Sequence, residues 1–281
     1  MASVVVGSVA KAWARFAEFE RNFNGSEWIE WTRNHAEIPV FAVSFYLGFV
    51  FYVPSLLEHR KAFTLRWPFA AWNVFLALFS VCGSIRTVPT LYAYLTTKGV
   101  DYTVCAAPRE WYLNGPVGLW VGLFIFSKIP ELIDTFFLVM QKKRVIFLGW
   151  FHHTTVMLYC WHAYHNCIAP GLWFACMNYL VHSVMYTYYF LMVFKPLRPY
   201  ARAIAPLITT VQIAQMAVGT SVTVRSAQLY YGGRRCAVDP ANFKLGLGMY
   251  GSYLVLFSLL FWDKYFAGPK KGGGPKKVGG A

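Results

Sequence analysis

Ionisable side chains interrupt one of the most apolar segments of this chain. Lys128, Glu131, Asp134 and Thr135 lie within residues 115–140, which otherwise hold only apolar residues, glycine, proline and one serine. At helical pitch these four positions share one face, so three ionisable groups point the same way. A charge inside a bilayer costs a few kcal/mol or more unless it faces the protein interior and finds partners there. The segment therefore predicts a polar chamber inside a bundle of membrane-spanning helices.

The composition of the whole chain supports this interpretation. Its 281 residues are 57% hydrophobic and only 14% charged, whereas roughly a quarter of the residues of a soluble domain are charged. These values predict an all-α polytopic membrane protein with one membrane domain. The formal net charge of +14 could instead indicate a nucleic-acid-binding protein. However, the lysines and arginines lie in short loops between apolar runs, which is the pattern of membrane topology, so no nucleic acid is expected as a partner.

Seven segments are apolar and long enough to be candidate membrane spans, since about 20 residues cross a bilayer. They are residues 38–57, 68–83, 115–140, 145–164, 169–194, 203–224 and 245–262. The second is short and could extend through residues 88–95 as a broken or re-entrant piece. This layout divides the chain into an N-terminal lumenal segment (1–37), a seven-span membrane domain (38–266) and a disordered basic tail (267–281). The start of the N-terminal segment has the pattern of an amphipathic helix that lies on the bilayer surface.

Positive charges identify the cytosolic side of this seven-span bundle. They gather in three loops and in the C-terminal tail, at Arg60, Lys61, Arg66, Lys142, Lys143, Arg144, Lys195, Arg198, Arg202, Lys264, Lys270, Lys271, Lys276 and Lys277. The positive-inside rule then places the C-terminus in the cytosol and the N-terminus in a lumen or outside the cell. Cys105 and Cys236 both fall in loops on the lumenal side, where an oxidising compartment permits a disulfide. The sequence leaves open whether these two cysteines pair or stay free.

Four consecutive predicted spans carry polar side chains at overlapping depths. Asp134 precedes Lys142 by eight residues and His152 follows Arg144 by eight, so both are roughly 12 Å deep at about 1.5 Å per residue. The next two spans contribute Asn178, His182, Tyr186, Tyr189, Thr209, Gln212 and Gln215. Each group alone could serve helix packing, an aromatic belt or a structural ion pair. Their coincidence at one depth, where no water satisfies them, favours a chamber.

Three segments form motifs in a fixed order along the chain. Residues 128–135 read KIPELIDT and fit the pattern KxxExxDT, and residues 178–189 read NYLVHSVMYTYY and fit HxxMYxYY with a preceding asparagine. Residues 209–215 read TTVQIAQ and fit TxxQxxQ. In order, spacing and seven-span layout, essentially the whole chain resembles the very-long-chain fatty acid elongases, the ELO family of 3-ketoacyl-CoA synthases.

A fourth motif of that family departs from its pattern in this chain. The family's HxxHH box begins here with glycine, because residues 149–153 read GWFHH. Positions 149, 152 and 153 share a helical face, so the missing imidazole would have pointed into the same chamber. Either the chain is an impaired or altered relative, or the first histidine is dispensable. The sequence leaves both hypotheses open.

The resemblance implies a decarboxylative condensation of malonyl-CoA with a long-chain acyl-CoA, the first step of the fatty acid elongation cycle. It implies that His152 is the nucleophile, which takes the acyl group as an acyl-imidazole before the malonyl-derived enolate attacks it. His153 and His182 would orient the malonyl unit or stabilise its enolate oxygen, with Asn178 fixing one imidazole. No cysteine belongs to this set, which argues against the cysteine nucleophile of soluble condensing enzymes.

The remaining site residues receive supporting roles from the same resemblance. Lys128, Glu131 and Asp134 would position the thioester and hold the imidazole tautomers. The expected contacts to pantetheine or to the pocket wall come from Thr135, Tyr186, Tyr189, Gln212 and Gln215. The CoA phosphates would pair with basic residues at the cytosolic mouth, namely Lys142, Lys143, Arg144, Lys195 and Arg198. Each of these basic residues could equally be a topology determinant only.

The resemblance also implies where the protein works and with which molecules. We expect a multi-pass protein of the endoplasmic reticulum membrane with its N-terminus lumenal and its C-terminus cytosolic. The expected partners are acyl-CoA, malonyl-CoA, membrane lipid and the other enzymes of the elongation cycle, and a homo-oligomer is left open. No cofactor is expected.

Two hypotheses from other classes compete with an elongase. A membrane di-iron desaturase or hydroxylase needs about eight imidazole ligands for its two irons, whereas this chain has seven histidines in total. Of these, His35, His162 and His165 fall on the lumenal side of the predicted topology. A transporter could use the same chamber for a ligand, but the paired half-helices typical of such proteins are not visible.

Overall fold

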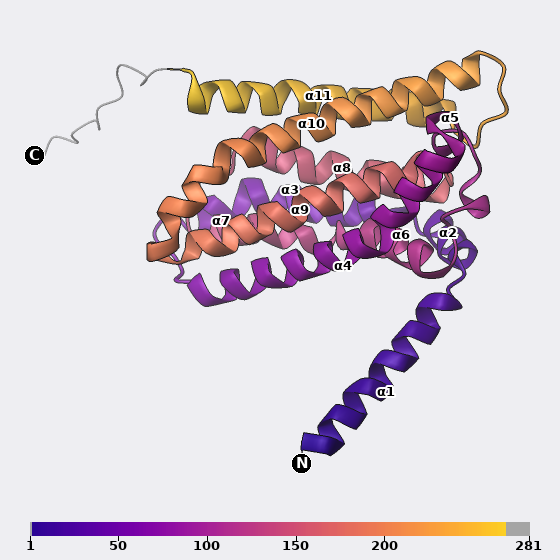
Figure 1. The fold of residues 1–281 in the computed structure, drawn as a ribbon. Coiled ribbons are helices and arrows are strands. Elements are labelled where there is room, and N and C mark those ends of the chain that lie inside the picture. Colours follow the sequence, from indigo (N-terminus) through magenta and orange to yellow (C-terminus); the bar gives the residue numbers. More distant parts are fainter. Residues whose placement is uncertain (1, 268–281) are drawn as a thin grey trace, which may run out of the picture.

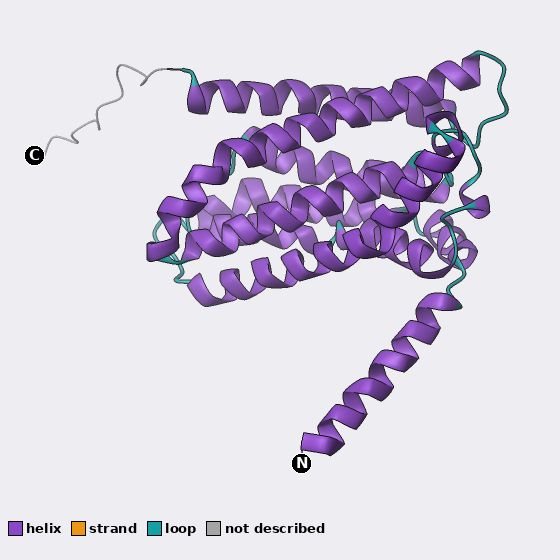
Figure 2. Cartoon of the chain, in the orientation of Figure 1, coloured by secondary structure: helices purple, strands orange, loops and turns teal. Residues whose placement is uncertain are grey.

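The described part of the chain, residues 2–267, is built from helices in a computed structural model (Figure 1). Within that range no strand is present, and loops join the helices (Figure 2). Helices dominate because a backbone in hydrocarbon must satisfy its hydrogen bonds within the segment. The all-α prediction is confirmed. The predicted basic tail lies, apart from its first residue, outside the described residues.

The helices follow one another without domain-sized interruptions. In chain order they are α1 (Ala2–Arg21), α2 (Gly25–Asn34), α3 (Glu37–Leu56), α4 (Arg66–Lys98), α5 (Val100–Thr103), η1 (Pro108–Glu110), α6 (Gly115–Ser127), η2 (Pro130–Leu132), α7 (Ile133–Met140), α8 (Phe147–His165), α9 (Gly171–Val193), η3 (Lys195–Leu197), α10 (Arg198–Tyr231) and α11 (Pro240–Tyr265), where η marks a 3-10 helix. Helices α3, α4, α6 with α7, and α8 to α11 correspond to the seven predicted spans.

Four helical segments are long and apolar enough to cross a membrane by composition, namely α3, α4, η3 with α10, and α11. The segment 115–140 is divided between α6 and α7, and each part is too short to cross alone. The 88–95 segment is not the broken or re-entrant piece that we predicted, because α4 continues through Pro89 as one helix. A proline inside a membrane helix is tolerated where neighbouring helices support the backbone, and α4 packs along the length of α9.

The long helices run side by side and enclose a common interior (Figure 1). Each helix contacts the next in a closed series. The order is α4, α9, α10, α11, α8, α3, α7, and then, through η2, α6, which contacts α4 again. The outward faces carry large exposed apolar side chains such as Phe41, Phe45 and Leu259. Apolar side chains on this outer surface are suited to contact with lipid, so the multi-pass membrane interpretation stands. Connecting loops lie at two opposite ends of the bundle, and the end of α11 lies opposite α2 (Figure 1).

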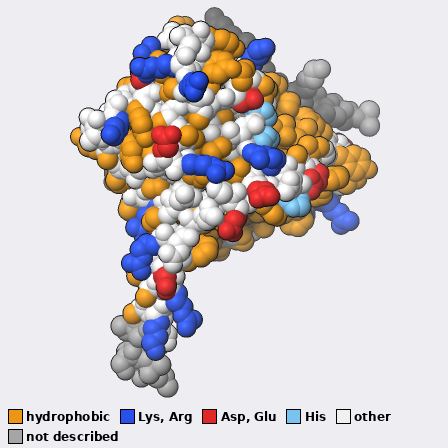
Figure 3. All heavy atoms as spheres, turned by 90° about the vertical axis from the view of Figure 1, so that its right-hand side faces the viewer, with side chains coloured by type: hydrophobic (Ala, Val, Ile, Leu, Met, Phe, Trp, Pro, Cys, Tyr) orange, Lys and Arg blue, Asp and Glu red, His pale blue; other side chains and the backbone are white. Residues whose placement is uncertain are grey.

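Helix α1 projects away from one end of the bundle, where charged side chains gather on the surface (Figure 3). Its last turn is fixed by Glu20, which is only 2% exposed. Arg86 on α4 donates two hydrogen bonds to this carboxylate at 3.1 and 2.8 Å, and the Trp120 indole donates a third at 2.7 Å. The amphipathic helix that we predicted therefore forms and is attached to the bundle. Its position on a bilayer surface stays a prediction.

The same end of the bundle is closed by three segments, residues 99–114, 166–170 and 232–239, which we call the cap. Cys105 is disulfide-bonded to Cys236, so the two cysteines left open by the sequence are paired. The Ala237 amide donates to the Cys105 carbonyl, and the Ala169 amide donates to the Ala237 carbonyl. In this way the disulfide and the backbone hydrogen bonds join all three segments.

An ion pair ties the cap to helix α10. The Arg225 guanidinium donates two hydrogen bonds to Asp101, at 2.8 and 2.9 Å, and Arg234 donates a third at 3.2 Å. These hydrogen bonds, chiefly those from Arg225, lower the pKa of Asp101. The cap is therefore held by covalent, backbone and charged contacts together.

We predict that the Cys105–Cys236 disulfide is present in the purified protein and stabilises the cap. Alkylation of the unfolded, unreduced chain should modify the four free cysteines, and alkylation after reduction should modify all six. Cys105→Ser should lower the unfolding free energy by about 2–5 kcal/mol, because it releases a long closed loop in the unfolded chain. Mass spectrometry and thermal unfolding in detergent measure the two effects. Six modified cysteines without reduction would contradict the pairing.

Candidate active site

A cavity of about 1050 Å³, which we call the chamber, opens at the end of the bundle opposite the cap. Its wall comes from α4, α7, α8, α9, α10 and α11 and from the loops that follow α3 and α7. The predicted site residues that line it are Asp134, Thr135, Lys143, Arg144, His152, His153, Asn178, His182, Tyr186, Tyr189, Arg198, Gln212 and Gln215. The fold thus brings together side chains from four predicted spans that are distant in sequence.

The predicted common face of Lys128, Glu131 and Asp134 assumed one continuous helix. The structure instead divides this polar segment between α6, η2 and α7. Helix α6 ends at Ser127, and Pro130 begins the 3-10 turn η2 before α7 starts. Proline cannot donate the backbone hydrogen bond that would continue the helix. Lys128 directly follows α6 and Glu131 lies in η2, and across this break the Lys128 ammonium lies 2.6 Å from Glu131 Oε1.

Lys128 and Glu131 belong to a buried polar network behind the chamber wall. Both are at most 3% exposed, and neither lines the chamber. Lys128 Nζ also donates to Asn178 Oδ1 at 3.0 Å, and the Ser127 hydroxyl donates to Glu131 Oε1 at 2.9 Å. Asn178 Nδ2 lies 3.1 Å from Nε2 of His182. The five members of the network therefore connect α6, η2 and α9.

This network determines the proton position on His182. An ammonium group only donates hydrogen bonds, so it must face the oxygen of the Asn178 amide, and the amide NH₂ must face His182. His182 Nε2 then accepts, and the proton of the neutral ring resides on Nδ1. That nitrogen lies 4.0 Å from Glu131 Oε2, an oxygen that makes no hydrogen bond within the described residues. Glu131 thus faces the Nδ1 proton electrostatically and fixes the ring orientation.

Asp134 has separate partners from Lys128 and Glu131. The Trp72 indole donates to its Oδ1 and the Tyr186 hydroxyl donates to its Oδ2, both at 2.7 Å. The next residue, Thr135, is hydrogen-bonded to Tyr46 at 2.8 Å. Asp134 therefore anchors two aromatic side chains at the chamber wall. The sequence motif identified Asp134 and Tyr186, whereas Trp72 and Tyr46 carried no signal that separates them from lipid-facing aromatics.

His152 and His153 differ from His182 in having free ring nitrogens. Within the described residues neither imidazole makes a hydrogen bond to another protein group, and both rings line the chamber. The His152 ring lies 5.0 Å from that of Tyr253 on α11, and the Tyr253 hydroxyl donates to the backbone carbonyl of His152 at 3.1 Å. A neutral imidazole with an unengaged lone pair is suited to act as a nucleophile or a base.

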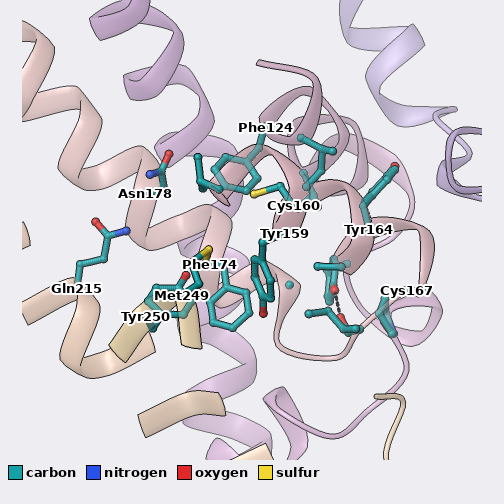
Figure 4. Close-up of a pocket in the computed structure, with 18 of the residues that line it drawn as sticks. Phe124, Tyr159, Cys160, Tyr164, Cys167, Phe174, Asn178, Gln215, Met249 and Tyr250 are labelled. Carbon is teal, nitrogen blue, oxygen red and sulfur yellow. Dashed lines mark hydrogen bonds between the residues drawn. The ribbon is translucent and has the colours of Figure 1, made fainter. Parts of the chain in front are cut away.

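A second, narrow cavity, which we call the tunnel, continues from the chamber toward the cap (Figure 4). His152, Asn178, Gln215 and Met216 line both cavities and so mark their junction. Beyond them the tunnel wall is apolar and aromatic, with Phe124, Tyr159 and Phe174 among its side chains. In Figure 4 Asn178 and Gln215 lie at one end and Cys167 at the other. A polar chamber joined to an apolar tunnel can hold an amphiphile with its reactive group at the junction.

Basic side chains surround the open end of the chamber. Of the five predicted for phosphate contacts, three line the chamber (Lys143, Arg144, Arg198), together with Arg66, Arg202 and Lys264. The last three belong to the loops and tail that mark the cytosolic side, and loop position alone does not show which cations face inward. Lys142 and Lys195 do not line the chamber; Lys142 instead donates to the Glu58 carbonyl at 2.8 Å.

Gly149 lies on the chamber wall near His152 and His153. A Cβ atom at this position would meet only Ile146 Cγ1, at 3.9 Å, which is ordinary van der Waals contact. A larger side chain could therefore extend from position 149 into the chamber without moving the backbone.

The histidines and carboxylates of the site are not arranged as metal ligands. Within residues 2–267 no group of three or more His, Cys, Asp or Glu side chains is arranged to hold a metal ion. His162 and His165 lie at the end of α8 next to the cap, away from His152 and His153.

Comparison with known proteins extends these observations. The sequence profile of the ELO (GNS1/SUR4) family matches residues 31–273. Fatty acid elongase 3 of Trypanosoma cruzi (strain CL Brener) is 42% identical over 92% of this chain and 94% of its own length. Very long chain fatty acid elongase 4 of the same organism is 45% identical over 90% of this chain and 88% of its own. Very long chain fatty acid elongase 6 of Drosophila melanogaster is 36% identical, over 92% and 82%.

We predict that removing one partner of the Lys128–Glu131 pair lowers the unfolding free energy more than removing both. Lys128→Met should lower the unfolding free energy by about 3–5 kcal/mol, because it leaves a buried carboxylate without its cation. The double variant Lys128→Met with Glu131→Met should be less destabilised than Lys128→Met alone. Asp101→Asn, which removes the anion of an exposed ion pair, should have a much smaller effect. Thermal unfolding in detergent measures all four proteins, and a double variant at least as destabilised as Lys128→Met would contradict the network.

Proposed function

The chain belongs to the ELO (GNS1/SUR4) family, and from this premise we propose that it is a fatty acid elongase. It condenses a long-chain acyl-CoA with malonyl-CoA and releases 3-ketoacyl-CoA, CO₂ and free CoA, which is the reaction of a very-long-chain 3-oxoacyl-CoA synthase. The condensation opens each turn of fatty acid elongation. Its products and substrates are amphiphiles, and the joined polar and apolar cavities are suited to them.

The observation that carries this proposal is the position of His152. Its ring lies where the chamber meets the tunnel, and its nitrogens are free of protein hydrogen bonds. An acyl-CoA whose tail fills the tunnel and whose CoA fills the chamber has its thioester at this junction. The substrate geometry therefore presents the reactive carbonyl to the one imidazole that lines both cavities.

The reaction proceeds in two halves. A lone pair of His152 attacks the acyl thioester; the carbon–nitrogen bond forms, the carbon–sulfur bond breaks, and the CoA thiolate leaves with the imidazole proton as free CoA. Malonyl-CoA then loses CO₂, and the electron pair of the broken bond remains as a thioester enolate. The enolate carbon attacks the carbonyl of the acyl-imidazole; the carbon–carbon bond forms, the carbon–nitrogen bond breaks, and the departing imidazole nitrogen takes up a proton from water in the chamber, so that neutral His152 is regenerated.

The surrounding residues orient these groups. His153 faces the chamber with free nitrogens and stabilises the enolate oxygen by donating a hydrogen bond. Asn178 and Glu131 hold His182 in one tautomer, so His182 shapes the malonyl site from a fixed position. Tyr186, held by Asp134, and the neighbouring Tyr189, Thr135, Gln212 and Gln215 contact the pantetheine arm. The lysines and arginines at the chamber opening pair with the CoA phosphates.

Gly149 stands where the motif of the family carries the first histidine of HxxHH, and the proposed reaction proceeds without that imidazole. His152 and His153 supply the nucleophile and the enolate donor from the same helix. The open space beside Gly149 leaves room for water to solvate this part of the chamber. The alternative, an impaired relative, predicts that restoring histidine is required for turnover.

The proposed location is the endoplasmic reticulum membrane, crossed seven times, with the chamber opening to the cytosol. CoA esters are cytosolic, and the positively charged loops lie at the chamber end, as the positive-inside rule requires. The disulfide-bonded cap then faces the oxidising lumen together with the N-terminus. Substrates arrive from, and products pass to, the other enzymes of the cycle in the same membrane, and assembly with a second copy is compatible with this arrangement.

We predict that radiolabelled malonyl-CoA is incorporated into acyl-CoA by the purified protein and that His152→Ala lowers the rate at least about 10³-fold, because no other group takes the acyl chain. Cys176→Ala, which alters a buried free cysteine that lines neither the chamber nor the tunnel, serves as the control and should retain most activity. Gly149→His should change the rate less than about tenfold. Full activity in His152→Ala would contradict the nucleophile. Turnover that occurs only in Gly149→His would establish the impaired relative instead.

We predict that basic residues lining the chamber raise the affinity for CoA esters. Arg144→Gln should raise the KM for acyl-CoA by about threefold to tenfold, since a charge-assisted hydrogen bond to phosphate is lost, with little change in kcat. Lys142→Gln, two residues away but bonded to Glu58, should leave KM unchanged. Equal effects of the two substitutions would contradict the assignment and favour a general electrostatic role.

A further inference from the structure

The junction between the chamber and the tunnel contains a buried amide without a protein partner. Gln215 on α10 is 8% exposed and lines both cavities. Within residues 2–267 its side-chain amide makes no hydrogen bond to another protein group. In Figure 4 the side chain extends from its helix toward Asn178. A buried amide without a partner costs free energy, so Gln215 is placed to bind a group that the protein itself does not supply.

The other residues of the junction do not offer such donors. Met216 has neither an N–H nor an O–H group in its side chain. Asn178 Oδ1 accepts from Lys128 at 3.0 Å, and Asn178 Nδ2 lies 3.1 Å from His182 Nε2, which leaves Asn178 at most one N–H. His152 is the proposed nucleophile. Gln215 is therefore the junction residue whose side chain keeps two N–H donors unengaged.

A second glutamine on the same helix shows what distinguishes this position. Gln212 lies three residues nearer to the start of α10, which is at the chamber end. It lines the chamber but not the tunnel, and its Nε2 donates to Met185 Sδ at 3.4 Å. The two positions differ by about 4.5 Å along the helix axis. A CoA ester with its tail in the tunnel thus presents pantetheine to Gln212 and the thioester to Gln215.

The thioester carbonyl needs a hydrogen-bond donor at this place. When an imidazole nitrogen attacks the carbonyl carbon, the carbon–nitrogen bond forms and the π electron pair moves to the oxygen. A fixed N–H donor in a buried site stabilises this oxyanion strongly. The electron pair then returns, the carbon–sulfur bond breaks, and CoA leaves as the thiolate. The same oxygen becomes negative again when the enolate attacks the acyl-imidazole, because the acyl carbonyl stays on His152 between the two steps.

We propose that Gln215 is a catalytic residue that donates a hydrogen bond to the oxyanion of the acyl group in both halves of the reaction. The inference rests on the proposed elongase function, since that function places the thioester at the junction. The thioester is the end of the pantetheine arm, so the contact made by Gln215 is narrowed to one atom, the acyl oxygen. His153 keeps its separate role as donor to the enolate oxygen of the malonyl unit.

The first test follows the two halves of the reaction separately. Free CoA released from myristoyl-CoA alone, in a single turnover, measures transfer of the acyl group to the protein, and steady-state condensation with malonyl-CoA measures the whole reaction. Gln215→Met has a similar shape but no N–H donor. It should lower the acyl-transfer rate and kcat by about 10²–10³-fold, as loss of one oxyanion donor does. The KM for myristoyl-CoA should stay within about threefold, because the contact strengthens only in the transition state.

Two other glutamines of α10 serve as matched controls. Gln228 is exposed and lines neither cavity, so Gln228→Met should keep the wild-type rates. Gln212→Met should raise KM for myristoyl-CoA more than it lowers kcat, because Gln212 faces the pantetheine. A raised KM with unchanged kcat in Gln215→Met would overturn the proposal, and so would an equal loss of kcat in Gln212→Met.

Thermal unfolding distinguishes a catalytic from a structural role. Gln215 has no protein partner to lose, so Gln215→Met should keep or raise the unfolding temperature. A glutamine that serves the packing of α10 would instead make the variant less stable. A marked fall in the unfolding temperature together with the loss of activity would assign Gln215 a structural role and overturn the proposal.

A binding measurement without chemistry separates this inference from the proposed function. In the His152→Ala background no acyl transfer to this residue occurs, and thermal stabilisation reports ligand binding. Myristoyl-CoA should bind at least about threefold more tightly than tetradecyl-CoA, a thioether that lacks the carbonyl oxygen. Adding Gln215→Met should abolish this difference. If the wild type transfers no acyl group, the proposed function is contradicted while this comparison still tests the contact. Equal binding of the two ligands, or a difference that Gln215→Met leaves unchanged, would overturn the assignment of Gln215.

Discussion

The rest of this structure depends on how the protein satisfies charge inside a membrane. Lys128 and Glu131 are almost fully buried, and the cost of burying them is offset by their contact of 2.6 Å, by hydrogen bonds to Ser127 and Asn178, and by the Phe124 ring 4.3 Å from the ammonium. Because this pair is almost fully buried, it cannot shift without leaving a charge unpaired. It therefore holds α6, the turn η2 and α9 in fixed relation. The chamber wall is packed against these fixed elements.

The three histidines of the chamber differ in how this buried network contacts them. One histidine, His182, is hydrogen-bonded to Asn178 at Nε2 and faces the Glu131 carboxylate with Nδ1, 4.0 Å away. The two histidines on the neighbouring helix keep their nitrogens free, and His152 lies where polar and apolar cavities meet. A ring that is held serves to position groups, and a ring that is free can react. The proposed division of roles among three similar side chains thus rests on which of them the buried network reaches.

Much of this arrangement was predictable from the sequence, because apolar length predicts spans and intramembrane polarity predicts an interior face. Lys128, Asn178 and His182 were identified in this way, and they form a chain of hydrogen bonds, although Lys128 lies behind the chamber wall and not on it. The break in the helix at Pro130 could not be predicted in this way. A short 3-10 turn leaves the polar residues at nearly the spacing of a continuous helix, so the sequence pattern looks the same in both cases. Nor could the sequence show that Tyr112 lines the tunnel, because its position depends on a disulfide-bonded loop and on its hydrogen bond to Ile168. Lys142 and Lys143 are adjacent in sequence, and only the fold shows that one of them faces the chamber.

We propose that His152 carries the acyl group between the two halves of the reaction. Peptide mass spectrometry can detect this covalent intermediate. Purified protein is incubated with myristoyl-CoA alone, digested, and compared with a sample that afterwards receives malonyl-CoA. The account predicts one myristoyl group on the peptide that contains His152 in the first sample and its loss in the second. An acyl group on a cysteine, or condensation at a normal rate with no acylated peptide at any time, would contradict it.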